Sequence, residues 1–366
     1  MLFSYSISKQ TNSLQVPKMK DLTIDNITEN VHFINGQCSD RRLKFIVERL
    51  VSHAHDLVRE TRLSTEEWMA AIQFLTEVGQ TCTETRQVIP PTPWQMHSSH
   101  LHCVNTDWHV PNESKEFILL SDILGISLLV DAIDHPKPPG ASEGTVLGPF
   151  HTHEAQNIEH GGGIASDPEG EPLLVLCTVR DSEGKALEDV KIDVWETDSK
   201  GFYDVQYANH DGPDGRAILT SDKDGIFWFK AIVPVPYPIP SDGPVGKLLA
   251  KLGRHCYRPS HMHFMFSHPI YDPLITALYL KNDPYETSDA VFGVKNTLVV
   301  ELGRVEDEAI ASKYGVKVGS ALMKYDFVLV TKEEALNLRY QNAAAAMKAQ
   351  GKKMEYLNGL PVPEVD

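Results

Sequence analysis

The chain has 366 residues and a formal net charge of −16, because 50 aspartates and glutamates outnumber 34 lysines and arginines. An acidic surface without a concentrated basic patch repels phosphate backbones, which argues against nucleic-acid binding. The five cysteines are widely spaced and the sequence has no run of about 18 apolar residues, so we expect neither a disulfide framework nor a membrane span, and we predict a cytoplasmic protein.

The first part of the chain has the periodicity of helices. Between residues 40 and 62, apolar side chains recur every three to four positions, which predicts one long helix. A capping box at residues 64–67 begins a second helix, and residues 115–133 are apolar nearly all round, which predicts a single buried helix. We therefore assign residues 21–139 to a helical region, preceded by a disordered N-terminus at residues 1–20.

From about residue 140 the pattern changes to short β-branched and aromatic runs separated by Gly, Pro, Asp and Asn. We expect strands at residues 172–179, 190–196, 216–220, 226–233, 261–266, 274–280, 296–302 and 325–330. Many short strands with frequent turns predict an antiparallel β-sandwich or barrel, here at residues 140–331. Thr331 and Glu334 form a capping box that begins an alanine-rich C-terminal helix and tail at residues 332–366. The predicted fold class is α+β with an antiparallel β-sandwich core.

Two histidines in the stretch YRPSHMHF occupy alternate positions of a predicted strand. Because residues i and i+2 of a strand share one face, His261 and His263 present two imidazoles to the same point, as metal ligands do. Tyr203 in GFYDVQY, Tyr237 in PVPYPIPSDGP and Arg258 near the histidines are further candidates. Each also has an ordinary structural interpretation: satisfied core histidines, packed tyrosines and a surface salt bridge.

Three segments taken together resemble one family. DVWETDSKGFYDVQY, VPYPIPSDGPVG and YRPSHMHF are similar, in order and spacing, to the intradiol ring-cleavage dioxygenases, non-haem ferric enzymes that open catechol-type rings. The resemblance covers roughly residues 40–85 and 116–335. It implies a homodimer formed through the N-terminal helices and one non-haem Fe(III) per subunit. The positions that match the family's iron ligands are Tyr203, Tyr237, His261 and His263.

The types of donor suit this cofactor. Phenolate oxygens are hard anionic ligands that suit a highly charged metal, whereas an Fe(II) oxygenase shows two histidines and one carboxylate. The resemblance also implies individual roles. Tyr237 is the ligand that the substrate displaces and then serves as a proton acceptor, Tyr203 stays bound, and Arg258 stabilises negative charge that develops on the ring.

Three further segments, LLSDILG, VLGPFH and YPIP, resemble the hydroxyquinol 1,2-dioxygenases of this family. The implied substrate pocket consists of Leu119, Asp122, Val146, Gly148, Pro149, Phe150, Ile239, Pro240 and Arg258. Asp122 would accept a hydrogen bond from a third ring hydroxyl, unless it only hydrogen-bonds the backbone. We therefore predict cleavage of hydroxyquinol (1,2,4-trihydroxybenzene) by O₂ to maleylacetate in aromatic catabolism. Cleavage of catechol to cis,cis-muconate is the alternative.

The chain departs from the family pattern in two places. Ala277 stands where some catechol-cleaving members have a glutamine near the arginine. Residues 88–115 look inserted between two helices that relatives join almost directly. The insert is a surface loop, an untranslated intron carried into the sequence, or a second metal site. Its candidate ligands would be Met96, His97, His100, His102, Cys103 and His109.

Two functions of other classes stay open from the residues alone. A β-sandwich of this kind without metal can serve as a carrier or an interaction module. A zinc hydrolase that uses His261 and His263 is the other interpretation, disfavoured because tyrosine is a rare zinc ligand.

Overall fold

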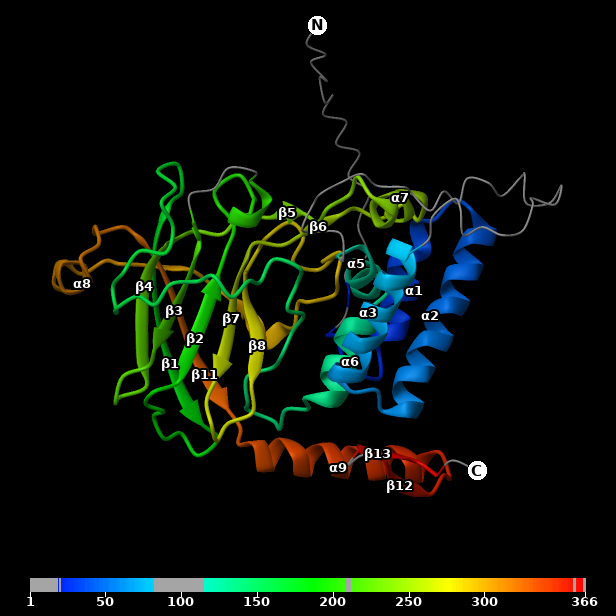
Figure 1. Cartoon of the computed structure of the whole chain (residues 1–366). Helices are drawn as coiled ribbons and strands as arrows, with labels where there is room; N and C mark the ends of the chain where they lie inside the picture. Colours follow the sequence, from blue (N-terminus) through cyan, green and yellow to red (C-terminus); the bar gives the residue numbers. More distant parts are fainter. Residues whose placement is uncertain (1–18, 20, 82–114, 208–211, 358–359, 365–366) are drawn as a thin grey trace, which may run out of the picture.

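The computed structural model describes residues 19, 21–81, 115–207, 212–357 and 360–364 (Figure 1). The predicted disordered N-terminus lies outside the described residues apart from Met19. The 88–115 insert, including all its candidate metal ligands, lies outside them apart from Lys115. Both stay predictions, as do the predicted domain limits.

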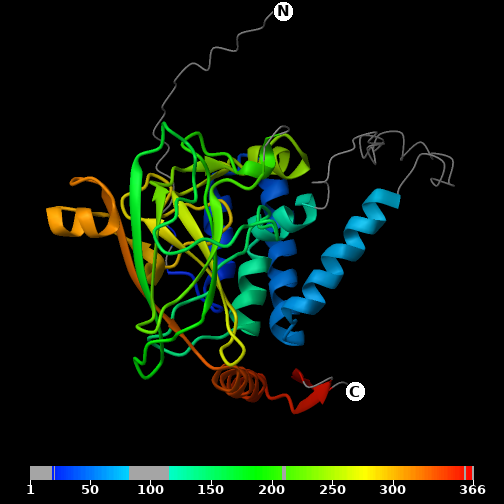
Figure 2. The same cartoon turned by 60° about the vertical axis from the view of Figure 1, so that its left-hand side comes forward.

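The N-terminal part of the chain folds into helices that lie together beside the sheets (Figures 1 and 2). The bounds are α1 Ile27–Ile34, α2 Arg41–Thr61, α3 Thr65–Thr81, α5 Lys115–Ile123 and α6 Ile126–Asp134. The predicted helices at α2 and α3 are confirmed, and Ser64 and Glu67 form the predicted capping box. The apolar faces of these helices share one core with Val146 and Ile239, so the helical region reaches the predicted substrate pocket.

The single helix predicted at residues 115–133 is wrong, because the chain breaks between α5 and α6 at Gly125. This glycine has φ +73°, and a β-carbon there would lie 3.0 Å from Cγ2 of Val31 and 3.1 Å from Cγ1 of Ile27. Only glycine adopts this backbone conformation without strain while leaving room for α1. The break places Asp122 at the end of α5.

In the described part of the chain, strands form a four-stranded and a five-stranded sheet as well as two short pairs. The first sheet has the order β10 (Gly303–Arg304), β11 (Ala321–Leu329), β1 (Pro172–Asp181), β4 (Ile226–Ile232). The second has the order β3 (Arg216–Thr220), β2 (Lys191–Trp195), β7 (His261–Ser267), β8 (Leu274–Leu280), β9 (Val299–Val300).

The prediction of purely antiparallel sheets is wrong. β1 pairs with β11 in parallel, and so does β8 with β9. β1 and β11 are far apart in the chain, and residues 281–298 connect β8 to β9, so each parallel pair has a long connection that can bring two strands side by side in the same direction. The alternation of apolar side chains shows which face of a strand is buried, but not the direction of its neighbour.

The two sheets share one apolar core, which fixes the direction of the site residues. Met262 and Phe264 on β7 belong to this core together with Phe227 on β4 and Phe327 on β11. Because side chains alternate along a strand, His261 and His263 on β7 lie on the opposite face of the five-stranded sheet. A short antiparallel pair, β5 (Tyr237–Pro238) with β6 (Tyr257–Arg258), brings Tyr237 opposite Arg258.

The C-terminal helix α9 (Lys332–Ala349) begins with the predicted capping box and runs from the sheets to beneath the helical region (Figure 1). Arg339 of α9 forms a buried ion pair with Asp134 at the end of α6. A hairpin of β12 (Met354–Leu357) and β13 (Leu360–Pro363), which the sequence did not reveal, follows. Three helices that were not predicted individually are α1, α7 (Pro244–Lys251) and α8 (Glu308–Tyr314). None of the described helices is long and apolar enough to cross a membrane.

Candidate active site

Four predicted ligand side chains meet at one buried point. Nε2 of His261 lies 3.1 Å from Nε2 of His263 and 3.5 Å from Oη of Tyr237. The hydroxyl of Tyr203 donates a hydrogen bond of 3.1 Å to Oη of Tyr237. All four side chains are at most 2% exposed. The structure therefore brings together residues that lie up to 60 positions apart in the chain.

The surrounding chain restricts three of these side chains. The indole of Trp195 stacks on the imidazole of His263, with ring centres 4.7 Å apart, and the ring of Phe150 stacks on that of Tyr203 at 4.6 Å. Trp195 and His263 are register neighbours on β2 and β7, so the sheet itself sets their contact. Gly201, at φ +83°, lies so close to Tyr237 that a β-carbon would come within 2.9 Å of its Cβ. A side chain at this glycine would separate the two tyrosines.

The electrostatics favour neutral imidazoles. Burial and the charge of Arg258 hold the pKa of His261 well below its ordinary value, and burial followed by the charges of His261 and Arg258 does the same for His263. Nδ1 of His261 lies 2.6 Å from the carbonyl oxygen of Pro259, so this nitrogen carries the proton and donates it. The lone pair of Nε2 is left facing the other donors, as metal binding requires.

Burial has the opposite effect on the two phenols. It raises the pKa of Tyr203 well above its ordinary value, and it also raises the pKa of Tyr237, although the charge of Arg258 partly offsets this. A bound cation reverses such a preference, because it stabilises the phenolate. Two neutral nitrogens and two buried phenols around one point thus fit a highly charged metal ion. In the described part of the chain, no three His, Cys, Asp or Glu side chains form a metal-binding group, so the tyrosines distinguish this arrangement.

Arg258 does not form the surface salt bridge that its ordinary interpretation suggested. Its side chain is buried and pairs with the carboxylate of Asp289, with Nε 3.2 Å from Oδ1. Nη2 also donates to Oη of Tyr279 at 3.1 Å. Sequence reasoning missed Asp289 and Tyr279. Tyr279 had one signal in the sequence, since it lies on a predicted strand. In the structure it pairs in register with His261.

The predicted substrate-pocket residues fall into three groups. Leu119, Val146 and Ile239 are buried in the helical core, and Phe150 packs beside the tyrosines. Pro149 and Pro240 are half-buried. Gly148 lies nearest the centre: with φ +74°, a β-carbon there would be 3.8 Å from Nε2 of His263 and 4.0 Å from Nη1 of Arg258. Ala277, at the departure from the family pattern, is buried and pairs in register with His263.

Asp122 is the acidic member of the predicted pocket. It is 3% exposed, and burial raises the pKa of its carboxyl from 3.8 to about 6. A hydrogen bond with Ser127 and the charge of Arg258 limit this increase, whereas the charge of Asp289 adds to it. The charges of Arg258 and Asp289 thus both reach this carboxyl.

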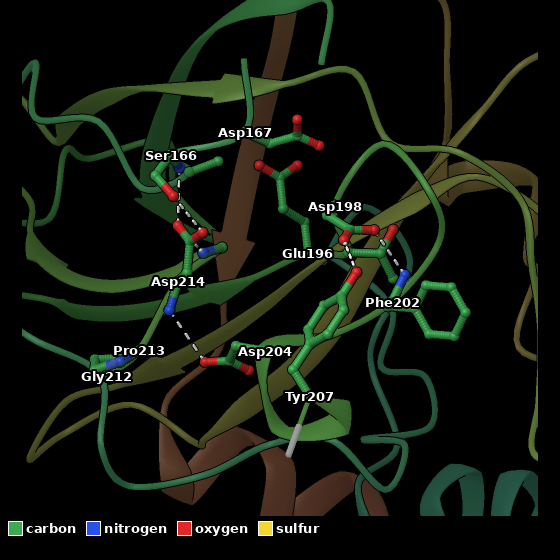
Figure 3. A pocket seen from close by; sticks show the side chains of 13 residues that line it. Ser166, Asp167, Glu196, Asp198, Phe202, Asp204, Tyr207, Gly212, Pro213 and Asp214 are labelled. Atoms are coloured by element: carbon green, nitrogen blue, oxygen red, sulfur yellow. Dashed lines mark hydrogen bonds between the residues drawn. The ribbon is translucent and has the colours of Figure 1, made fainter. Parts of the chain in front are cut away.

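A separate cavity of about 360 Å³ lies next to the loop that carries Tyr203 (Figure 3). Its wall includes Phe202 and Asp204, on either side of this tyrosine, and several carboxylates. Most of these carboxylates are held within the loops: Asp198 accepts hydrogen bonds from backbone N–H groups and from Tyr207, and Asp214 accepts them from Ser166. The cavity contains none of the four meeting donors, and its hydrogen bonds support the loop behind Tyr203.

Comparison with known proteins identifies the family. A family model described as Dioxygenase matches residues 146–331, and one described as Catechol dioxygenase N terminus matches residues 40–91. The intradiol ring-cleavage dioxygenase hqdA of Aspergillus niger is 60% identical over 355 residues, which cover 97% of this chain and 99% of that protein. The chain belongs to the intradiol ring-cleavage dioxygenases. This intradiol dioxygenase is therefore an enzyme of a family that uses non-haem iron, and the carrier and zinc-hydrolase interpretations are not supported.

Two further relatives of this intradiol dioxygenase bear on the fold and the substrate. The hydroxyquinol 1,2-dioxygenase of Rhizobium sp. is 43% identical over 80% of this chain and 90% of that protein. The solved structure of hydroxyquinol 1,2-dioxygenase from Pseudomonas putida DLL-E4 has a TM-score of 0.57 at 36% identity, and it covers 84% of this chain and 99% of that one.

The raised pKa of Asp122 predicts a pH-dependent effect on stability. The folded chain binds the proton of this carboxyl more tightly than the unfolded chain, so its contribution to stability is greatest at low pH and is lost as pH rises through about 6. We expect Asp122→Asn to gain stability relative to the unmodified chain between pH 5 and 8, by on the order of 1 kcal/mol. Urea denaturation at both pH values measures this change. Asp56→Asn, at an exposed position of α2, is the control. If the free energy of unfolding of Asp122→Asn fell relative to that of the unmodified chain as pH rises, this would contradict the assignment.

Proposed function

We propose that this intradiol dioxygenase cleaves hydroxyquinol with O₂ to maleylacetate, as a step in aromatic catabolism. It would use one non-haem Fe(III) per subunit, held by Tyr203, Tyr237, His261 and His263. The observation that carries the proposal is the meeting of these four buried donors near the guanidinium of Arg258, whose charge also acts on the pKa of the buried Asp122 carboxyl. When bound, ferric iron supplies a Lewis-acidic centre that orients a chelated diol and draws electron density from its ring.

The two tyrosines have different surroundings, which supports different roles. Oη of Tyr237 lies between Tyr203 and His261, and β5–β6 pairing brings its backbone opposite Arg258. Burial raises the pKa of Tyr237, so its phenolate is a strong base once it is no longer held by a cation. We propose that Oη of Tyr237 accepts a proton from a ring hydroxyl and later returns it. Tyr203, clamped by Phe150, stays in place.

Arg258 is proposed to act on charge rather than on protons. Its guanidinium is buried and ionised next to Asp289, and it stands near both the histidines and Tyr237. A fixed positive charge in a dry site stabilises negative charge that develops on the ring as oxygen is inserted. Gly148 has no side chain, and a β-carbon there would already contact Nη1 of Arg258 and Nε2 of His263, so a larger residue would crowd the side on which the ring is proposed to bind.

Asp122 is proposed to select the substrate. Hydroxyquinol has a third hydroxyl that catechol lacks, and a buried carboxyl that accepts a hydrogen bond from it would be left unpaired by catechol. The relatives from Rhizobium sp. and Pseudomonas putida are named as hydroxyquinol 1,2-dioxygenases, which supports the same substrate here.

Steady-state kinetics with both substrates test this proposal. We expect the unmodified enzyme to have a higher kcat/KM for hydroxyquinol than for catechol. Asp122→Ala should lower the value for hydroxyquinol by about 10- to 100-fold, because hydroxyquinol loses a hydrogen bond, and should leave the value for catechol the same or higher, because catechol no longer leaves a buried carboxyl unpaired. The control is Glu116→Ala on the same helix, where Glu116 accepts a hydrogen bond from Val245 N. Equal loss on both substrates would remove Asp122 as the selector, and a native preference for catechol would overturn the proposed substrate.

We also propose a homodimer formed through the N-terminal helices. Large apolar side chains of α2 and α3 are about half exposed, which is unusual for so many neighbours on a solvated surface. They are Phe45, Ile46, Leu50, Leu57, Met69, Phe74, Leu75 and Val78. A second copy that covers these faces would remove them from water.

Light scattering on the purified protein tests the dimer. We expect a mass of twice the chain for the unmodified protein and of a single chain for Leu50→Glu, because burying a charge in an apolar interface is unfavourable. Ile270→Glu is the matched control, since Ile270 is an equally exposed apolar residue outside the helices. A monomeric native protein, or a Leu50→Glu variant that stays dimeric, would contradict the proposed interface.

A cytoplasmic location is proposed on the basis of the thiols. Cys38, Cys177 and Cys256 are unpaired among the described residues, and two of them are buried. Free buried thiols are typical of proteins kept in a reducing compartment.

A further inference from the structure

A buried carboxylate, that of Asp289, holds the guanidinium of Arg258. Its oxygens Oδ1 and Oδ2 accept hydrogen bonds from Nε and Nη2 of Arg258 at 3.2 and 3.3 Å. Backbone N–H groups of Val291 and Gly293 donate to the same two oxygens at 3.2 and 3.0 Å. Asp289 is 0% exposed, so water does not compete for these bonds. Because two of the four donors are backbone groups, the carboxylate cannot turn without opening its own loop.

These contacts decide which nitrogen of Arg258 faces the meeting point of the four donors. Nη2 also donates to Oη of Tyr279, so Nε and Nη2 are both engaged. Nη1 lies toward Gly148, where a β-carbon would be 4.0 Å from Nη1 and 3.8 Å from Nε2 of His263. The remaining N–H groups of Arg258 are therefore directed to the side on which the ring is proposed to bind.

The loop that carries the carboxylate is itself fixed from the helical region. Arg254 is buried and donates from Nη1 to the carbonyl oxygen of Ile123 at 2.7 Å and from Nη2 to that of Ala290 at 2.9 Å. At the other end of the loop, the backbone of Gly293 packs directly against the guanidinium of Arg258, so the loop cannot move closer to it. A β-carbon there would lie 2.8 Å from Nη2 of Arg258.

We propose that Asp289 is the positioning residue that aims Nη1 of Arg258 at the bound ring, an assignment that rests on the proposed function. Both oxygens of Asp289 are engaged by Arg258 and by backbone N–H groups, so it acts through the arginine. A guanidinium with no fixed partner rotates about its side-chain bonds and loses the alignment on which transition-state stabilisation depends. The buried pair is thus a device for orientation.

Asp289→Asn tests the assignment directly. Asparagine keeps the shape of the side chain but lacks the charge and has only one acceptor oxygen, so the two-point grip on the guanidinium is lost. We expect kcat for hydroxyquinol to fall on the order of 100-fold with KM changed much less, because the aligned charge matters most in the transition state. Asp134→Asn is the matched control: it breaks another buried Asp–Arg pair, with Arg339, at the junction of α6 and α9. It should lower Tm but leave kcat unchanged.

A double-mutant cycle with Arg258→Met separates positioning from mere structural support. If Asp289 acts only through the arginine, Asp289→Asn changes kcat by less than about 3-fold once Arg258 is absent. The iron-free protein provides a second readout. Each single variant leaves one buried charge unpaired and should lower Tm by roughly 4–6 °C, whereas the double variant should recover most of this loss.

Two results would overturn the proposal: a kcat for Asp289→Asn close to that of the unmodified enzyme, or the same fold-loss of kcat in both backgrounds of the cycle. Failure of the proposed function looks different, because the unmodified enzyme itself would then not turn over hydroxyquinol.

Discussion

The burial of polar groups around one point is the constraint on which the rest of the structure depends. Two imidazole nitrogens face each other at 3.1 Å, with two phenol oxygens beside them, in surroundings that exclude water. Such groups are unfavourable inside a protein unless something pairs with them. Neutral imidazoles and phenols of raised pKa tolerate burial, and a metal cation would satisfy all of their lone pairs at once.

The fold separates two tasks between the faces of one sheet. On β7, Met262 and Phe264 fill the core between the sheets, while the alternate histidines lie on the other face. The helical region then covers that face and supplies Asp122 from the end of α5 and, through Arg254, a hold on the loop of Asp289. Strands carry Tyr237 and the two histidines, a loop carries Tyr203, and the helical core lies against them, so residues from distant parts of the sequence form one site.

The sequence predicted the parts of this arrangement that depend on local periodicity. His261 and His263 share a face because strands repeat every two residues, and the helices at α2, α3 and α9 follow from apolar spacing and capping boxes. It could not show the break at Gly125, because a glycine inside an apolar run becomes decisive only when α1 packs against it. The parallel pairing of β1 and β11 was missed for a similar reason: strand direction depends on contacts between distant segments.

The same limit applies to the site. The four predicted ligand positions rest on resemblance, whereas Asp289 was missed because its partner Arg258 is 31 positions away and the segment after β8 that carries Asp289 has no recognisable pattern. Iron content and the visible spectrum of the purified protein test the central claim, that Tyr203, Tyr237, His261 and His263 form one ferric site. We expect close to one iron per chain and a red to burgundy colour from phenolate-to-iron charge transfer. Protein that binds iron without this colour, or keeps the colour when both tyrosines are changed to phenylalanine, would contradict the claim.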